Sequence, residues 1–164
     1  MLKEGFGVLQ EKLFESIRHF YGERLISVVL FGSVARGTFN FFSDIDVLII
    51  ARELPQGRIL RVREFEKVEE ELIPLLDELR REAGIQTEIS PILKSPEEAQ
   101  RGSPLFLDMV EDGIILFDRD NFFSNILDRL RDRLKALGAK RVWRGETWHW
   151  VLKPDFKPGE VFEI

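Results

Sequence analysis

The sequence contains no cysteine and only two histidines, His19 and His149. The absence of cysteine excludes disulfides, thiolate nucleophiles and Cys-ligated zinc, and two histidines are too few for a histidine-rich metal site. Any metal that the protein binds should therefore be a hard cation held by oxygen ligands, as Mg²⁺ is.

Long hydrophobic runs are also missing. No apolar stretch reaches the ~18 residues that a membrane-spanning helix needs, and the N-terminus shows neither a charged-then-apolar leader nor a lipidation signal. We therefore expect a soluble, cytoplasmic protein without a membrane partner. The 164 residues, 44% of them hydrophobic, suit a single domain over residues 1–164.

Excess positive charge is lacking too, since the formal net charge is −5. This argues against a general nucleic-acid-binding protein, although residues 129–157 carry nine Lys and Arg against three acids. All three tryptophans lie in this stretch, where aromatic faces beside cations could stack on bases (Trp143, Trp148 and Trp150). Because Trp148, Trp150 and Leu152 alternate with their neighbours, they also fit the packed face of a hairpin. Nucleic acid is a possible partner, but not the favoured one.

Hydrophobic periodicity predicts alternating helices and strands. Helices are expected at about residues 6–21, at 58–83 with a break at Pro74, after Ser95 and Ser103, and in a long segment that ends at Gly138. Strands are expected at 25–31, 43–50, 85–93 and 113–117, followed by a hairpin around Gly145. The pattern predicts an α/β fold: a small mixed sheet flanked by helices, with a core at about 5–93 and an extension at about 94–164 that holds a C-terminal helix and hairpin.

Two carboxylates interrupt the apolar run of the second strand, in Ser43-Asp44-Ile45-Asp46-Val47. Residues two apart on a strand share a face, so both side chains can converge on one point. Two ionised carboxylates that close repel each other unless a divalent cation lies between them. Mg²⁺ takes one or two protein carboxylates and fills its other positions with water and phosphate oxygens. A strand-end pair that faces solvent is the alternative.

The first strand ends in Gly32-Ser33, and Arg36 in the same loop could add positive charge for binding a nucleotide. Glycine lets the backbone turn and approach a ligand closely, and the Ser hydroxyl and following N–H groups can meet phosphate oxygens. The alternative for this dipeptide is an ordinary turn. A third carboxylate would complete a two-metal site, and Glu88 is the best candidate, with a solvent-facing strand residue as the other interpretation.

The spacing Gly32-Ser33, residues 34 to 43, Asp44-Ile45-Asp46 resembles the signature of the nucleotidyltransferases of the DNA polymerase β superfamily. The order of elements over residues 5–93 is also similar to that family's minimal core. The resemblance implies transfer of a nucleoside monophosphate from an NTP, ATP in most members, to a hydroxyl acceptor with two Mg²⁺ ions. It implies that Asp44, Asp46 and Glu88 are catalytic metal ligands and that Gly32 and Ser33 bind phosphates. The family's third acid is usually Asp, so Glu88 departs from the pattern.

A second function class stays open at this point. Small members of the family resemble antitoxins that neutralise a partner such as a HEPN-type ribonuclease, by modification or by binding alone. Arg144 and His149 match the spacing of that ribonuclease's own motif, but the turn-forming residues between them argue against the helix it requires. The sequence selects neither the acceptor nor the base of the nucleotide, and a homodimer is a further possibility.

Overall fold

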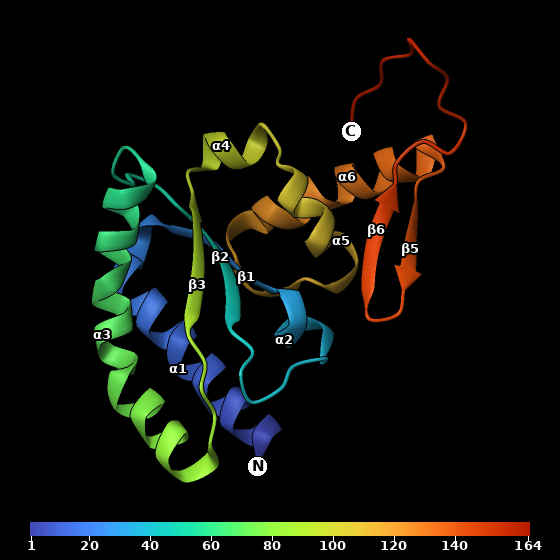
Figure 1. The fold of residues 1–164 in the computed structure, drawn as a ribbon. Coiled ribbons are helices and arrows are strands. Elements are labelled where there is room, and N and C mark those ends of the chain that lie inside the picture. Colours follow the sequence, from blue (N-terminus) through green and yellow to red (C-terminus); the bar gives the residue numbers. More distant parts are fainter.

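The computed structural model describes residues 1–164, which fold around one four-stranded sheet (Figure 1). The strands β1 (Leu25–Phe31), β2 (Ile45–Ala51), β3 (Ile89–Lys94) and β4 (Ile114–Asp118) lie in the order β3-β2-β1-β4. β1 is antiparallel to both β2 and β4, whereas β2 and β3 are parallel. The predicted α/β class with a mixed sheet is confirmed.

Helices α1 (Leu2–Tyr21) and α3 (Arg58–Ala83) cover one face of the sheet (Figure 1). α3 is the crossover that parallel pairing of β2 and β3 requires. Every second residue of β2 is fully buried in this face's core (Ile45, Val47, Ile49 and Ala51). The intervening position, Asp46, therefore belongs to the opposite face.

The other face is covered by the second half of the chain. The covering elements are α4 (Pro96–Gln100), the 3₁₀ turn η2 (Pro104–Asp108), α5 (Met109–Asp112) and α6 (Phe122–Leu137). Since both faces are covered, all seven residues of β1 are buried, which explains why that strand is apolar without alternation. No helix is both long and apolar enough to cross a membrane.

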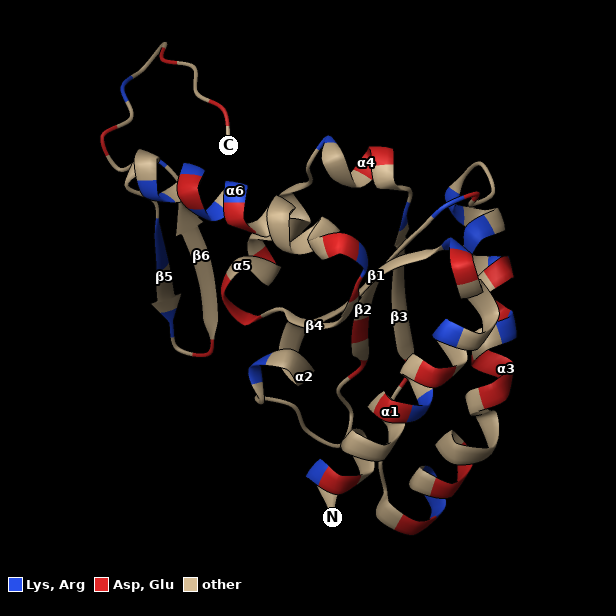
Figure 2. Ribbon diagram, turned by 180° about the vertical axis from the view of Figure 1, so that it is seen from behind, with Lys and Arg blue, Asp and Glu red and all other residues tan.

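A hairpin of β5 (Lys140–Arg144) and β6 (Thr147–Val151) forms a separate two-stranded sheet, as predicted. The indole N–H of Trp150 donates to the Leu107 carbonyl at 3.3 Å, and its ring packs against the core of the second face. Trp148, Trp150 and Leu152, the predicted packed face, are all partly buried, whereas Thr147 and His149 between them are exposed. Arg144 and His149 both lie on strands, which excludes the helical ribonuclease motif. Figure 2 shows how strongly basic β5 is.

Two predicted details of secondary structure are wrong. α3 runs without a break through Pro74, which lies on its exposed side, where water can satisfy the carbonyl left without a donor. The strand predicted at 85–93 begins only at Ile89, whose partner Ile45 is the first residue of β2. Upstream of Ile89 the burial still alternates, but the Gln86 N–H pairs with the Phe41 carbonyl of a loop instead of with a strand.

One buried cation joins α3 to α4. Arg61, 9% exposed, donates to both carboxylate oxygens of Glu98 at 2.7 and 3.0 Å and to the carbonyls of Pro55 and Leu93. Glu98 also completes the predicted capping box with Ser95. These hydrogen bonds, that from Arg61 foremost, lower the pKa of Glu98 below its ordinary value.

We expect Glu98→Gln to lower the stability at pH 7 by about 1 kcal/mol, or roughly 2–4 °C in Tm, since the carboxylate is partly exposed. Because the folded-state pKa lies below the unfolded one, the ionised carboxylate stabilises the fold above its ordinary pKa. This contribution is lost as the pH falls through the folded value. Thermal melts from pH 7 downward should therefore show the gap to wild type closing. The neighbouring Glu97→Gln, exposed and without a hydrogen-bonded partner, is the control; a gap independent of pH would contradict the assignment.

Candidate active site

The end of β1 and the start of β2 meet at Gly32 and Asp46. Antiparallel pairing sets Phe31 opposite Asp46, so the next residue, Gly32, lies directly beside that carboxylate. Gly32 has a φ of +70°, and a β-carbon there would collide with Oδ2 of Asp46 and lie 3.1 Å from its Cγ. Only glycine fits this position without strain or displacement. The two predicted parts of the site are thus in contact.

The two aspartates differ in environment. Asp44 is exposed, and its Oδ1 accepts the backbone N–H of Glu88 at 3.1 Å. Asp46 is half-buried, and its pKa is raised first by burial and then by the negative charge of Asp44, while the Arg36 cation acts in the opposite direction. Two mutually repelling carboxylates of this kind form a hard-oxygen donor set that suits Mg²⁺. Figure 2 shows the acidic start of β2.

Ser33 and Arg36 lie on α2 (Gly32–Arg36), the short helix that begins at Gly32. The carbonyl of Ser33 accepts the N–H groups of Gly37 and Thr38, which ends the helix. The first N–H groups of an α-helix have no acceptor within the helix, and α2 begins at Gly32, beside Asp46. Arg36, half-buried, is the cation whose charge lowers the pKa of both Asp46 and Asp108.

Glu88 enters the site through its backbone. It is exposed and precedes β3; its N–H donates to Asp44, and its carbonyl accepts the N–H of Ile45 at 2.9 Å. Its side-chain charge raises the pKa of Glu69 on α3 and is not among the charges that act on Asp46. No group of three or more carboxylates or histidines is arranged to hold a metal. Glu88 as a third metal ligand stays a prediction.

The structure adds Asp108, which the sequence analysis missed. It lies at the end of η2, half-buried, and its pKa is raised by burial and by Asp112. Its charge also contributes to the raised pKa of Asp46, after burial and the charge of Asp44, and the Arg36 cation acts on both carboxyls in the opposite direction. One acid inside the apolar segment 105–110 is the signal that could have revealed it, since a buried carboxylate needs a partner.

Comparison with known proteins agrees with this geometry. A family model described as "Nucleotidyltransferase domain" matches residues 11–117. A protein of Methanocaldococcus jannaschii named "Putative protein adenylyltransferase MJ1305" is 34% identical over 144 residues, covering 87% of this chain and 90% of its own. The chain belongs to the nucleotidyltransferase family. The resemblance seen in the sequence is thereby confirmed, and the family match extends from α1 through β4.

Two solved structures are similar to this nucleotidyltransferase at lower levels of identity. The toxin–antitoxin MntA-HepT shows 18% identity and a TM-score of 0.44, covering 79% of this chain and 90% of its own. Spectinomycin adenyltransferase AAD(9) from Enterococcus faecialis shows 14% identity and a TM-score of 0.49, covering 79% and 66%. At these values neither similarity carries a functional argument. The expectation of an antitoxin-like binding module therefore stays a prediction.

Proposed function

We propose that the protein is an adenylyltransferase that transfers AMP from ATP to a hydroxyl side chain of a protein. The contact between Gly32 and the Asp46 carboxylate carries the proposal, because it brings the turn that we propose to bind phosphate next to the aspartates that we propose to bind the cation. The choice of a protein acceptor is supported by the 34% identical relative, which is named as a protein adenylyltransferase. Other hydroxyl acceptors are outcomes of the test below.

In the proposed reaction, the acceptor hydroxyl oxygen forms a bond to the α-phosphorus of ATP and loses its proton. The bond between the α-phosphorus and the bridging oxygen breaks, and pyrophosphate leaves. Gly32, Ser33 and the first N–H groups of α2 would bind the terminal phosphates, since the backbone at Gly32 is open to close approach. Arg36, whose charge acts on Asp46 and Asp108, would add positive charge beside them.

Asp44 and Asp46 would hold Mg²⁺. Burial, and after it the charge of Asp44, raises the pKa of Asp46, so a divalent cation between the two carboxylates would relieve an unfavourable charge pair. When bound, magnesium supplies neutralisation of phosphate charge and orientation of the reacting oxygens. The exposed Asp44 and half-buried Asp46 leave the cation accessible to a nucleotide from the solvent side.

The position of the label in ATP tests the reaction class. The protein is incubated with Mg²⁺, a host-cell lysate and ATP labelled on either its α- or its γ-phosphate, and the products are separated by gel electrophoresis. Compared with the same lysate without the protein, we expect additional protein label only from the α-position. Additional label from the γ-position would indicate a kinase reaction instead. Label that survives protease treatment but is removed by ribonuclease would show that the acceptor is RNA.

Glu88→Gln tests the predicted third metal ligand. If the Glu88 carboxylate binds Mg²⁺, its loss should lower transfer by about 10³-fold, while the backbone N–H that binds Asp44 survives the change. Initial rates of α-label transfer at saturating Mg²⁺ measure this effect, with Glu69→Gln as the control for the repulsion between Glu69 and Glu88. Transfer within about tenfold of wild type would instead show that Glu88 acts through its backbone alone.

A further inference from the structure

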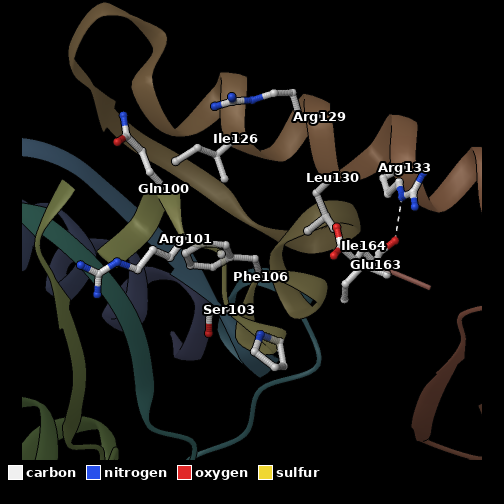
Figure 3. A pocket seen from close by; sticks show the side chains of 12 residues that line it. Gln100, Arg101, Ser103, Phe106, Ile126, Arg129, Leu130, Arg133, Glu163 and Ile164 are labelled. Atoms are coloured by element: carbon white, nitrogen blue, oxygen red, sulfur yellow. Dashed lines mark hydrogen bonds between the residues drawn. The ribbon is translucent and has the colours of Figure 1, made fainter. Parts of the chain in front are cut away.

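A pocket of about 540 Å³ lies between the α4–η2 connection, α6 and the last residues of the chain (Figure 3). None of its lining residues belongs to the candidate active site. Its floor is apolar, because Ile126 and Leu130 project from α6 toward the Phe106 ring (Figure 3). Arg101, Arg129 and Arg133 line its rim.

The three rim arginines are exposed and form no ion pair with any carboxylate of the chain. The protein has a net charge of −5, but three guanidinium groups without an ion pair surround this apolar floor, so the charge around the pocket is positive. Guanidinium groups bind carboxylates through paired N–H donors, and an apolar floor adds the burial of an aliphatic side chain. The pocket therefore suits a ligand that is both acidic and aliphatic.

A segment of the chain itself lies in this pocket and is held there through its backbone, while the Glu163 carboxylate forms no ion pair. The Nε–H of Arg133 donates to the backbone carbonyl of Glu163 at 2.6 Å, drawn as a dashed line in Figure 3. Glu163 and Ile164, an acidic and an aliphatic residue, both line the pocket. Ile164 is nevertheless 48% exposed, so this segment covers the pocket without filling it. The pocket thus accommodates a peptide backbone, and residues 163–164 are held in it by few contacts.

We propose that this pocket docks a short acidic peptide segment of a partner protein, in which a carboxylate side chain adjoins an aliphatic one. The partner's carboxylate pairs with Arg129 and Arg133, and its aliphatic side chain covers Ile126, Leu130 and Phe106. Residues 163–164 compete for the same contacts, so the partner's apparent affinity falls by the fraction of molecules in which they occupy the pocket. Docking needs neither nucleotide nor metal and is independent of the proposed transfer.

The test uses the full chain and a fluorescein-labelled, C-terminally amidated peptide with the sequence of residues 159–164, Gly-Glu-Val-Phe-Glu-Ile. Fluorescence anisotropy is measured without nucleotide and without metal. Arg129→Glu/Arg133→Glu should weaken binding about tenfold or more, because two attractive charges become repulsive. The matched control Arg18→Glu/Arg63→Glu makes the same charge change at exposed arginines of α1 and α3 and should leave binding unchanged. Glu163→Gly/Ile164→Gly in the full chain should tighten binding, since the internal competitor is weakened.

Several results would overturn the proposal. An equal loss in both arginine double variants would show attraction to overall charge alone. Equal binding of a peptide with Gln in place of both Glu residues would show that the arginines do not read carboxylates. Binding of inorganic triphosphate that depends on Arg129 and Arg133, without any peptide binding, would make the pocket a small-anion site.

Discussion

Gly32→Ala is expected to reduce nucleotidyl transfer by about 10²-fold or more while the protein stays folded. The new β-carbon would collide with Oδ2 of Asp46, so the carboxylate must move by on the order of 1 Å, and displacements of that size in a catalytic group can cost this much activity. The positive φ of +70° adds roughly 1–2 kcal/mol of backbone strain, which is less than the stability of a typical domain. Rates of α-label transfer and thermal melts measure the two effects separately.

Gly37→Ala is the matched control. Gly37, at the other end of α2, has nearly the same φ of +74°, but a β-carbon there would meet no atom within 4 Å. Both variants should therefore lose a similar amount of Tm, and only Gly32→Ala should lose transfer. Equal losses of activity would show that backbone strain in α2 explains the result and that the collision with Asp46 does not matter.

The centre of the site could be predicted because it is local in the chain. β1 and β2 are consecutive antiparallel strands joined by α2 and a short loop, so the end of one must lie beside the start of the next. Spacing along the sequence therefore determines that Gly32 and Asp46 meet. The buried, charged side chain in an apolar strand was the physical signal, since a carboxylate in that setting needs a partner.

The position of Asp108 depends on packing between segments that are far apart in the sequence. Hydrophobic periodicity predicts helices and strands, but it does not predict which of them pack together. The charges of Asp108 and Arg36 act on each other only because α5, which follows Asp108 directly, packs against α2. No pattern within residues 105–110 indicates which earlier helix this turn will meet. The start of β3 also depends on a distant segment. Ile85 and Thr87 are buried in alternation, as in a strand, but a strand needs a pairing partner, and β2 begins only at Ile45, opposite Ile89.

Asp46→Asn is expected to remove nearly all transfer, by about 10³-fold or more, because the amide keeps the shape of the side chain but cannot neutralise a divalent cation. The same variant should melt at a higher temperature than wild type in the absence of metal at pH 7. The folded-state pKa of Asp46 is raised by burial and by Asp44, so its ionisation destabilises the fold above that pKa and has no effect well below the unfolded value. Asparagine removes this cost.

Adding Mg²⁺ and a non-hydrolysable ATP analogue should reverse the order of stability. Ligands that bind only the native state raise the Tm of wild type, and Asp46→Asn should gain little from them. Asp77→Asn removes an exposed charge on α3 and is the control. It should match wild type in the rate of transfer, in the metal-free Tm and in the rise of Tm with Mg²⁺ and the nucleotide analogue. An Asp46→Asn protein that melts below wild type without metal, or that keeps its full response to Mg²⁺ and nucleotide, would contradict a cation-binding role for this carboxylate. Loss of activity together with a gain in metal-free stability is the combination that distinguishes a functional charge from a structural one, because a structural charge stabilises the fold that contains it.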